Sequence, residues 1–105
     1  MKLYRIVWTE KAVEQVDTIF DYISQDSVKA AQKVTDGIFY RVLQLKKFPL
    51  SGPEEEELKK FRKGHRYLAE GNYKIIYRIA DPVIFINAVF DTRQNPKKLR
   101  RIIRR

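Results

Sequence analysis

The spacing of the apolar residues changes once along the chain, and this change limits the possible folds more than any other feature. Between residues 10 and 45, apolar side chains recur every three or four positions, which is the period of a helix that buries one face. Between residues 66 and 90 they alternate or run without interruption, as they do in strands buried on one or both faces. The chain is therefore expected to place its helices first and most of its strands last.

The helical part divides into two amphipathic helices. The first is expected to follow Thr9, a good N-cap residue, and to run to about Ser24. The second is expected to follow Asp26 or Ser27 and to end before residues 48–53, where two prolines and a glycine stop a helix. The inward faces are predicted to consist of Ala12, Val13, Val16, Ile19, Phe20 and Ile23, and of Ala30, Ala31, Val34, Ile38, Val42 and Leu45. The adjacent alanines predict a close approach of the two helices.

The strands are predicted from β-forming residues and turn signals. Residues 3–8 form a short strand before the helices, and residues 66–69 and 73–79 flank a linker, 70–72, that is typical of a β-hairpin. Residues 83–90 are apolar on both faces, which indicates a strand in the middle of a sheet. The predicted fold class is α+β, with the order β-α-α-β-β-β, and the last three strands form an antiparallel meander covered on one face by the helical hairpin.

Length and composition exclude several classes of protein. With 105 residues and 44% hydrophobic positions, the chain is expected to form a single domain, 1–105. The absence of cysteine excludes disulfides, thiolate metal sites and a cysteine nucleophile, and the single histidine excludes a site built on two. No glycine-rich phosphate loop is present, so neither a cofactor nor a metal is expected. The N-terminus lacks a signal peptide and no segment is apolar enough to span a membrane, so we expect a cytoplasmic protein without a membrane partner.

The positive charge is concentrated near the C-terminus. The formal net charge is +9, and seven of the 22 Lys and Arg residues lie in the basic tail 93–105, which contains no acid. A second basic stretch, 59–66, follows the acidic run 54–57. Such a surface favours nucleic acid or an acidic protein segment, although charge runs of this kind also occur as solvated tails and loops. In the tail, Leu99, Ile102 and Ile103 have helical spacing and predict a short amphipathic helix that packs on the sheet or is completed by a partner.

Charged residues at the predicted strand ends form a second candidate site. Arg62 and Arg66 precede or begin one strand, Lys74 and Arg78 share a face of the next, and Asp91 and Arg93 follow the last. Gathered at one end of the sheet, these cations would bind phosphate or stabilise charge on a scissile phosphate. Alternatively, Arg66 and Arg78 pair with acids such as Glu70 or Asp91 and only order the sheet. His65 lacks a carboxylate spaced to orient it and is interpreted as a bystander, and Tyr4 and Trp8 as packing residues.

The order of elements and several local sequences together resemble the RelE/ParE superfamily of bacterial toxins from type II toxin–antitoxin systems. The segments that carry the resemblance are residues 4–12, Phe48-Pro49 with Gly52, residues 66–79 and residues 89–93. They extend over nearly the whole chain. The resemblance implies a small α+β toxin that is neutralised by a cognate antitoxin, whose C-terminal segment wraps around it.

Two branches of the superfamily differ in their target. The RelE-like branch cleaves mRNA on the ribosome, whereas the ParE-like branch is associated with poisoning of DNA gyrase. The nuclease branch usually carries an arginine where this chain has Lys74, and an arginine with a tyrosine or histidine near the C-terminus. Here Arg93 is present, but the chain has no tyrosine after Tyr77 and no histidine after His65. The resemblance therefore favours the ParE-like branch.

The leading interpretation is a ParE-like toxin that inhibits DNA gyrase or the topoisomerase machinery by protein contact and has a cognate antitoxin as partner. The first alternative is a ribosome-dependent mRNA endonuclease that uses Arg66, Lys74 and Arg93 to stabilise the phosphate. The second is a noncatalytic nucleic-acid-binding module that acts through the basic tail. A homodimer and a toxin–antitoxin hetero-oligomer both remain open. The candidate antitoxin- or target-binding residues are Arg62, Arg66, Lys74, Arg78, Asp91, Arg93, Arg100 and Arg101.

Overall fold

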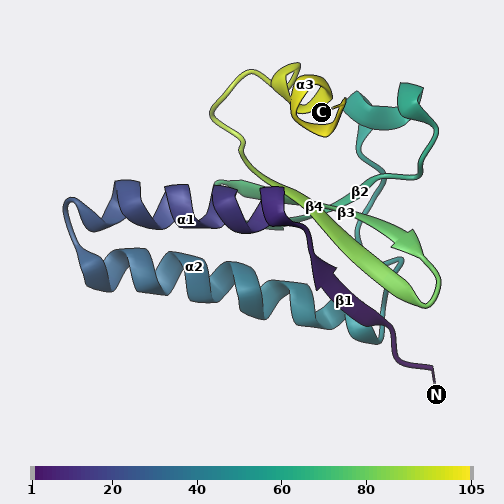
Figure 1. Cartoon of the computed structure of the whole chain (residues 1–105), viewed down its shortest axis with the longest axis horizontal. Helices are drawn as coiled ribbons and strands as arrows, with labels where there is room; N and C mark the ends of the chain where they lie inside the picture. Colours follow the sequence, from purple (N-terminus) through teal and green to yellow (C-terminus); the bar gives the residue numbers. More distant parts are fainter. Residues whose placement is uncertain (1, 105) are drawn as a thin grey trace.

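The computed structural model describes residues 2–104, so Arg105 of the predicted basic tail lies outside it. Its elements, in order, are β1 (Arg5–Trp8), α1 (Glu10–Ser24), α2 (Val28–Val42), the 3₁₀ helices η1 (Leu43–Lys46) and η2 (Glu56–Phe61), β2 (Arg66–Glu70), β3 (Tyr73–Ala80), β4 (Val83–Asp91) and α3 (Lys98–Arg104). Figure 1 shows α1 and α2 side by side on one side of the sheet, with α3 and η2 on the other. None of the helices within the described range is long and apolar enough to cross a membrane.

The four strands form one mixed sheet in the order β1-β4-β3-β2. Strands β2, β3 and β4 pair antiparallel through tight turns, which confirms the predicted meander. Strand β1 lies beside β4 and pairs with it in parallel, because the helical hairpin between β1 and the meander carries the chain back across the sheet. Strand β4 is therefore central, which explains why its residues are apolar on both faces.

A β-bulge interrupts the pairing of β3 with β4. Ile76 pairs with Ala88 and Tyr77 pairs with Ile86, so Asn87 is an extra residue on β4. The bulge shifts the alternation of β4 by one, and Ile86 and Val89 both join the core under the helical hairpin. Sequence alternation alone does not reveal this shift, because the whole strand is apolar.

Both long helices begin at the predicted caps. The Thr9 hydroxyl oxygen accepts a hydrogen bond from the Ala12 amide at 3.2 Å, and α1 ends at Ser24 as predicted. Of the two candidates for the second cap, Ser27 serves, with its hydroxyl oxygen 3.0 Å from the Ala30 amide nitrogen. Each cap satisfies one of the amides that a helix leaves without an internal partner.

The sheet face that α1 and α2 cover, here called the hairpin face, carries the larger core. Its buried side chains include Val16 and Ile38 from the helices, and Ile75 and Ile86 from the sheet. The prediction for α2 was wrong at Ala30, which is exposed. The inward stripe instead consists of Ala31, Thr35, Ile38 and Val42 of α2 and continues with Leu45 of η1, at three- and four-residue spacing. Only one alanine of the predicted pair therefore faces inward.

The opposite face of the sheet, here called the α3 face, carries a second and smaller core. Leu58 of η2 and Leu99 of α3 are fully buried against Ile76, Ala88 and Phe90 of the sheet. Of the two alternatives for the tail, the helix packs back on the sheet. The tail therefore forms part of the fold and is not a free basic extension.

Candidate functional site

A buried tyrosine and an arginine attach the segment Phe48-Pro49 with Gly52 to the sheet. The hydroxyl of Tyr77, a fully buried residue, donates to the Pro49 carbonyl at 2.7 Å and accepts from the Gly52 amide at 3.0 Å. Arg66, one of the predicted phosphate-binding residues, donates to the Gly52 carbonyl at 2.7 Å. A Cβ atom at Gly52 would lie 2.2 Å from the backbone oxygen of Tyr67, so only glycine fits. These motif residues fasten a loop to the sheet.

Lys74 is held in a partly buried ion pair. Its ammonium lies 2.7 Å from the carboxylate of Glu55, which is only 2% exposed, and 4.3 Å from the centre of the Tyr67 ring. The other oxygen of Glu55 accepts from the Glu57 amide at 3.0 Å and caps η2. The acidic run 54–57 is therefore not simply the solvated loop that its charge suggested, because Glu55 points inward and neutralises Lys74.

Arg78 shares the α3 face with Lys74 but lies four residues further along β3, a separation of about 13 Å for an extended strand. Its guanidinium stacks over the Phe85 ring, 5.6 Å from the ring centre. The alternative in which Arg66 and Arg78 pair with Glu70 or Asp91 is wrong. Glu70 instead lies 4.0 Å from Arg41, and Asp91 pairs with Arg93.

His65 is more deeply buried than a bystander on a basic loop would be. It is 5% exposed and lies near Arg78 and Lys63. Burial, together with these two positive charges, lowers the pKa of His65 below its ordinary value. The imidazole is therefore neutral at pH 7.

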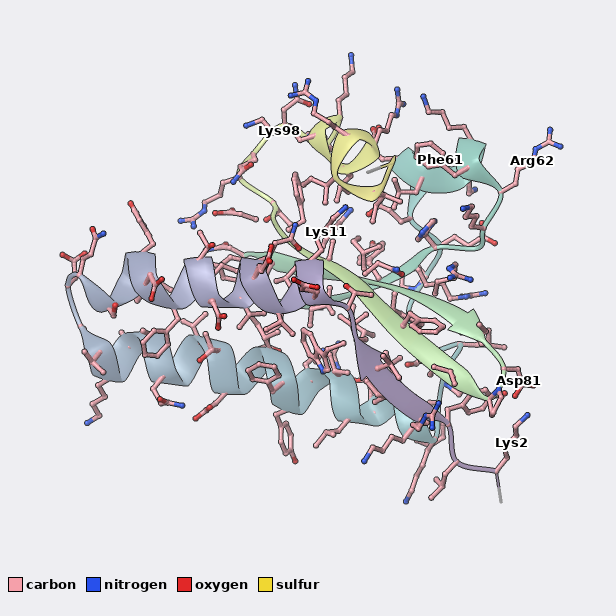
Figure 2. All side chains as sticks on the ribbon, viewed as in Figure 1. Lys2, Lys11, Phe61, Arg62, Asp81 and Lys98 are labelled. Atoms are coloured by element: carbon pink, nitrogen blue, oxygen red, sulfur yellow. The ribbon has the colours of Figure 1, made fainter. Side chains whose placement is uncertain are left out.

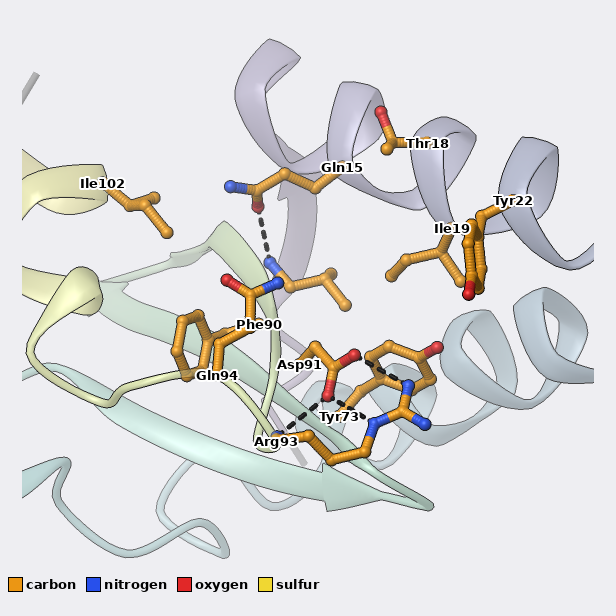
Figure 3. A pocket seen from close by; sticks show the side chains of 11 residues that line it. Gln15, Thr18, Ile19, Tyr22, Tyr73, Phe90, Asp91, Arg93, Gln94 and Ile102 are labelled. Carbon is orange, nitrogen blue, oxygen red and sulfur yellow. Dashed lines mark hydrogen bonds and ion pairs between the residues drawn. The ribbon is translucent and has the colours of Figure 1, made fainter.

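Asp91 and Arg93 form the charged wall of a cavity of about 390 Å³ beside α1. Figure 3 shows Arg93 folded back on Asp91, with Tyr73 and Tyr22 beside them. The two carboxylate oxygens of Asp91 accept from Arg93 at 2.8 to 3.0 Å, and these hydrogen bonds lower the pKa of Asp91. Burial raises the pKa of the Tyr73 hydroxyl, so this tyrosine is not a base at neutral pH.

The two arginines predicted in the tail differ in their contacts. Arg100 lies 3.1 Å from the Glu57 carboxylate and so connects α3 to η2, whereas Arg101 is exposed. Arg62 follows η2, adopts a left-handed backbone conformation with φ of 54° and points away from the sheet, as Figure 2 shows. The cations therefore occupy separate places instead of gathering at one end of the sheet. Nor do three His, Asp or Glu side chains gather as a metal site among the described residues.

Comparisons with known proteins agree on the family. Residues 6–96 match the family described as the ParE toxin of the type II toxin–antitoxin system parDE. The chain belongs to the ParE toxin family. The expected membership of the RelE/ParE superfamily is thus confirmed.

Two solved structures share the fold of this ParE toxin. The chromosomal ParDE system from P. aeruginosa matches with a TM-score of 0.70 and 22% identity, over 85% of this chain and 96% of that one. The RelBE2 toxin–antitoxin complex from Mycobacterium tuberculosis matches with a TM-score of 0.61 and 21% identity, over 87% of this chain and 93% of that one. No curated protein matches the sequence.

This ParE toxin also exposes apolar side chains that the sequence analysis did not consider as a site. We define the α2 apolar patch as the exposed large hydrophobic residues of the C-terminal half of α2 and of the segment after it: Phe39, Tyr40, Leu43, Phe48 and Leu50. Tyr40 is 79% exposed and Leu50 is 67% exposed. The helical period does predict that Phe39, Tyr40 and Leu43 are exposed, because they lie outside the predicted inward stripe. Concentrated exposed hydrophobic residues are typical of a protein-binding surface.

Proposed function

We propose that this ParE toxin acts on the bacterial topoisomerase machinery, specifically DNA gyrase, by protein–protein contact and without hydrolysing a substrate. The observation that carries the proposal is that the cations expected of a nuclease are already engaged within the chain. Lys74 neutralises Glu55 and Arg93 neutralises Asp91, while Arg66 is bound to a loop carbonyl. Cations engaged in this way offer little charge to a phosphate outside the molecule.

The placement of the same residues also argues against catalysis by charge. Stabilising a scissile phosphate requires several donors fixed around one point. Lys74 lies against η2, whereas Arg93 lies in the cavity beside α1. The candidate bases do not help, because Tyr73 has a raised pKa and His65 lies near the opposite end of β3 from Arg93. A contact function places no such demand on the geometry.

We also propose that a cognate antitoxin neutralises the toxin by covering the α2 apolar patch and the exposed basic side of α3. The two solved structures compared above are described as a ParDE system and a RelBE2 toxin–antitoxin complex. The α2 apolar patch fits the apolar side of an amphipathic segment, and Arg101 fits its acidic side. Replacing Tyr40 and Leu43 by serine is expected to weaken antitoxin binding in a titration, whereas Lys33→Gln on exposed α2 surface is not.

The deciding experiment is induced expression in a bacterial host, with DNA supercoiling and double-strand breaks scored in parallel with cleavage of ribosome-bound mRNA. Broken or relaxed DNA with intact message is the expected result, and coexpression of the antitoxin should abolish it. Cut message with intact DNA would overturn the proposal and assign the protein to the endonuclease branch.

A matched variant makes the same experiment more discriminating. Arg93→Gln removes a largely exposed charge whose partner is Asp91, so the fold should persist, which circular dichroism checks. If Arg93 were catalytic, this change would abolish mRNA cleavage. For a toxin that acts by contact at another surface, DNA damage in the host should remain close to that of the unchanged chain.

A further inference from the structure

A cavity at the N-terminus of α1 differs in its contacts from the ion-paired cations described above. Its volume is about 370 Å³, within the range of about 300–1,000 Å³ typical of ligand pockets. It lies between the start of α1, the β3–β4 bulge, the segment before β2 and the end of α3. We call it the α1 cavity, and the lining residues used in the argument are Glu10, Lys63, His65, Arg78, Asn87 and Ile103.

Two residues that line the α1 cavity each carry a buried polar atom without a hydrogen-bond partner. The atoms are Nδ1 of His65, a residue that is only 5% exposed, and Oδ1 of Asn87. Leaving such an atom unpaired costs about 1–3 kcal/mol, and folded proteins leave few of them. Asn87 is also the extra residue of the β-bulge, a feature that often redirects a side chain beside a functional site. A bound ligand would supply the missing partners.

The α1 cavity is also electropositive. Among the described residues, no carboxylate lies within 4.0 Å of the charged groups of Arg78 or Lys63, in contrast to Lys74, Arg93 and Arg100. The first-turn amides of α1 add the positive end of a helix, and Glu10 is the one acidic residue that lines the cavity. An anion in the cavity would therefore meet two available cations and a helix N-terminus.

The end of α3 closes the α1 cavity on one side. The ammonium of Lys11 donates to the carbonyl of Ile102, and Figure 2 shows Lys11 between α1 and α3. Ile103 provides an apolar wall. A ligand in the cavity would thus contact groups from α1, the sheet and α3 together.

We propose that the α1 cavity binds a phosphate monoester that carries hydroxyl groups, which is the chemistry of a nucleoside monophosphate or a sugar phosphate. The phosphate oxygens accept from Arg78 and Lys63, close to the positive end of α1. A hydroxyl of the ligand donates to Asn87 Oδ1, and the neutral imidazole of His65 takes part as donor or acceptor. An acidic side chain of a partner protein fits less well, because a carboxylate has no donor for Asn87.

The test is a titration of the purified full-length chain with candidate ligands, in which binding is monitored by calorimetry and by amide chemical shifts. The probes are AMP, glucose 6-phosphate, inorganic phosphate and a glutamate-rich peptide. AMP or glucose 6-phosphate is expected to bind at least about tenfold more tightly than inorganic phosphate, since the hydroxyl contacts are lost with phosphate alone. The shifts should be concentrated at Glu10, His65, Arg78 and Asn87. The preference between the two esters identifies the source of the ligand.

Matched lysine variants separate a site from general attraction to a chain of net charge +9. Lys63→Gln is expected to weaken binding of the preferred ester about tenfold, and Lys33→Gln, which removes the same charge from exposed α2 surface, to leave it unchanged. Asn87→Ala should also weaken binding, and Lys63→Gln keeps the test valid if the bulge variant fails to fold. Equal losses in both lysine variants, no saturable binding, equal affinity for inorganic phosphate, or tighter binding of the peptide would each overturn the proposal.

Discussion

On the hairpin face of the sheet, α1 and α2 bury a large core of aliphatic and aromatic side chains, whereas on the α3 face η2 and α3 bury a small core bordered by ion pairs. The pairs are Lys74 with Glu55 and Arg100 with Glu57, and both connect the η2 layer to another element. The hairpin face is thus stabilised by apolar area, and the α3 face also depends on charges that must remain paired.

The two faces also differ in whether they carry polar groups that could contact a ligand. Within the described residues, the larger core has no buried side-chain nitrogen or oxygen that lacks a hydrogen bond. The three that do, on Glu57, His65 and Asn87, border the α3 side or the bulge, and the Glu57 oxygen is ion-paired with Arg100. Cations on the α3 face are either neutralised, as Lys74 is, or available, as Arg78 is. The comparison separates residues that hold the layer together from residues that can meet a ligand.

Breaking the Lys74–Glu55 pair is expected to have the largest effect on stability. Lys74→Met leaves the carboxylate of Glu55, 2% exposed, without its cation, and the free energy of unfolding should fall by about 3–5 kcal/mol. The double variant Lys74→Met, Glu55→Gln should recover most of the loss, because the amide carries no charge and can still accept from Glu57. Urea unfolding measures both. A loss below about 1 kcal/mol in the single variant would mean that the pair behaves like an exposed one.

Truncating one core residue on each face should show how independent the two layers are. Leu99→Ala and Ile38→Ala each remove a fully buried side chain and are expected to cost about 2–5 kcal/mol. Hydrogen exchange should distinguish them. Leu99→Ala is expected to increase exchange mainly in α3 and η2, whereas Ile38→Ala should increase it throughout the chain. Equal increases everywhere in both variants would contradict the division into two layers.

The hairpin face could be predicted from the sequence because its features depend on residues that are close together in the sequence. Thr9 as a cap, the end of α1 at Ser24 and the inward stripe of α2 all follow from spacing within a few turns, and the structure confirms them. The exceptions are Val13 and Ala30, which were predicted to face inward and are exposed. Each is next to a correctly predicted alanine, Ala12 or Ala31, and neighbours in a helix are about 100° apart, so only one of the two can face the sheet.

The α3 face and the candidate site could not be predicted in the same way, because their contacts join segments far apart in the sequence. Glu55 appeared to be part of a solvated acidic run, and its burial depends on Lys74, 19 residues later. Asn87 was not considered, since a bulge inside an apolar strand leaves no signal in the alternation. Arg66, Lys74 and Arg93 were recognised as cations, but only the structure gives their partners.

Removing the hydroxyl of Tyr77 should have an intermediate effect on stability. The effect should be confined to the loop around Pro49 and Gly52, between the helices and the last three strands. Tyr77→Phe leaves the Gly52 amide and the Pro49 carbonyl without their partner, and a loss of about 1–3 kcal/mol is expected. Tyr40→Phe, at a tyrosine that is 79% exposed, is the control and should change stability by less than about 0.5 kcal/mol. Thermal unfolding measures both, and equal losses would contradict the loop-holding role.

The smallest expected effect is a pH dependence that belongs to the α3 face. The pKa of His65 is lowered in the folded chain by burial and by the charges of Arg78 and Lys63, whereas the unfolded chain has the ordinary value of about 6.5. As pH falls through about 6.5, the unfolded chain therefore takes up a proton that the folded chain does not, and stability decreases. Above this range both forms are neutral and His65 contributes no pH dependence.

The variant His65→Gln isolates this contribution, because glutamine does not titrate. Both proteins are to be unfolded in urea at about pH 7.5 and about pH 5.5, and the chain with His65 should lose more stability on acidification than the variant. Comparing the two slopes removes the constant cost of the substitution itself. Carboxylates titrate mostly below this range, and Glu10, the acid that shares the α1 cavity, is present in both proteins. Equal slopes would mean that neither burial nor the cations Arg78 and Lys63 lower the pKa of His65 in the folded chain.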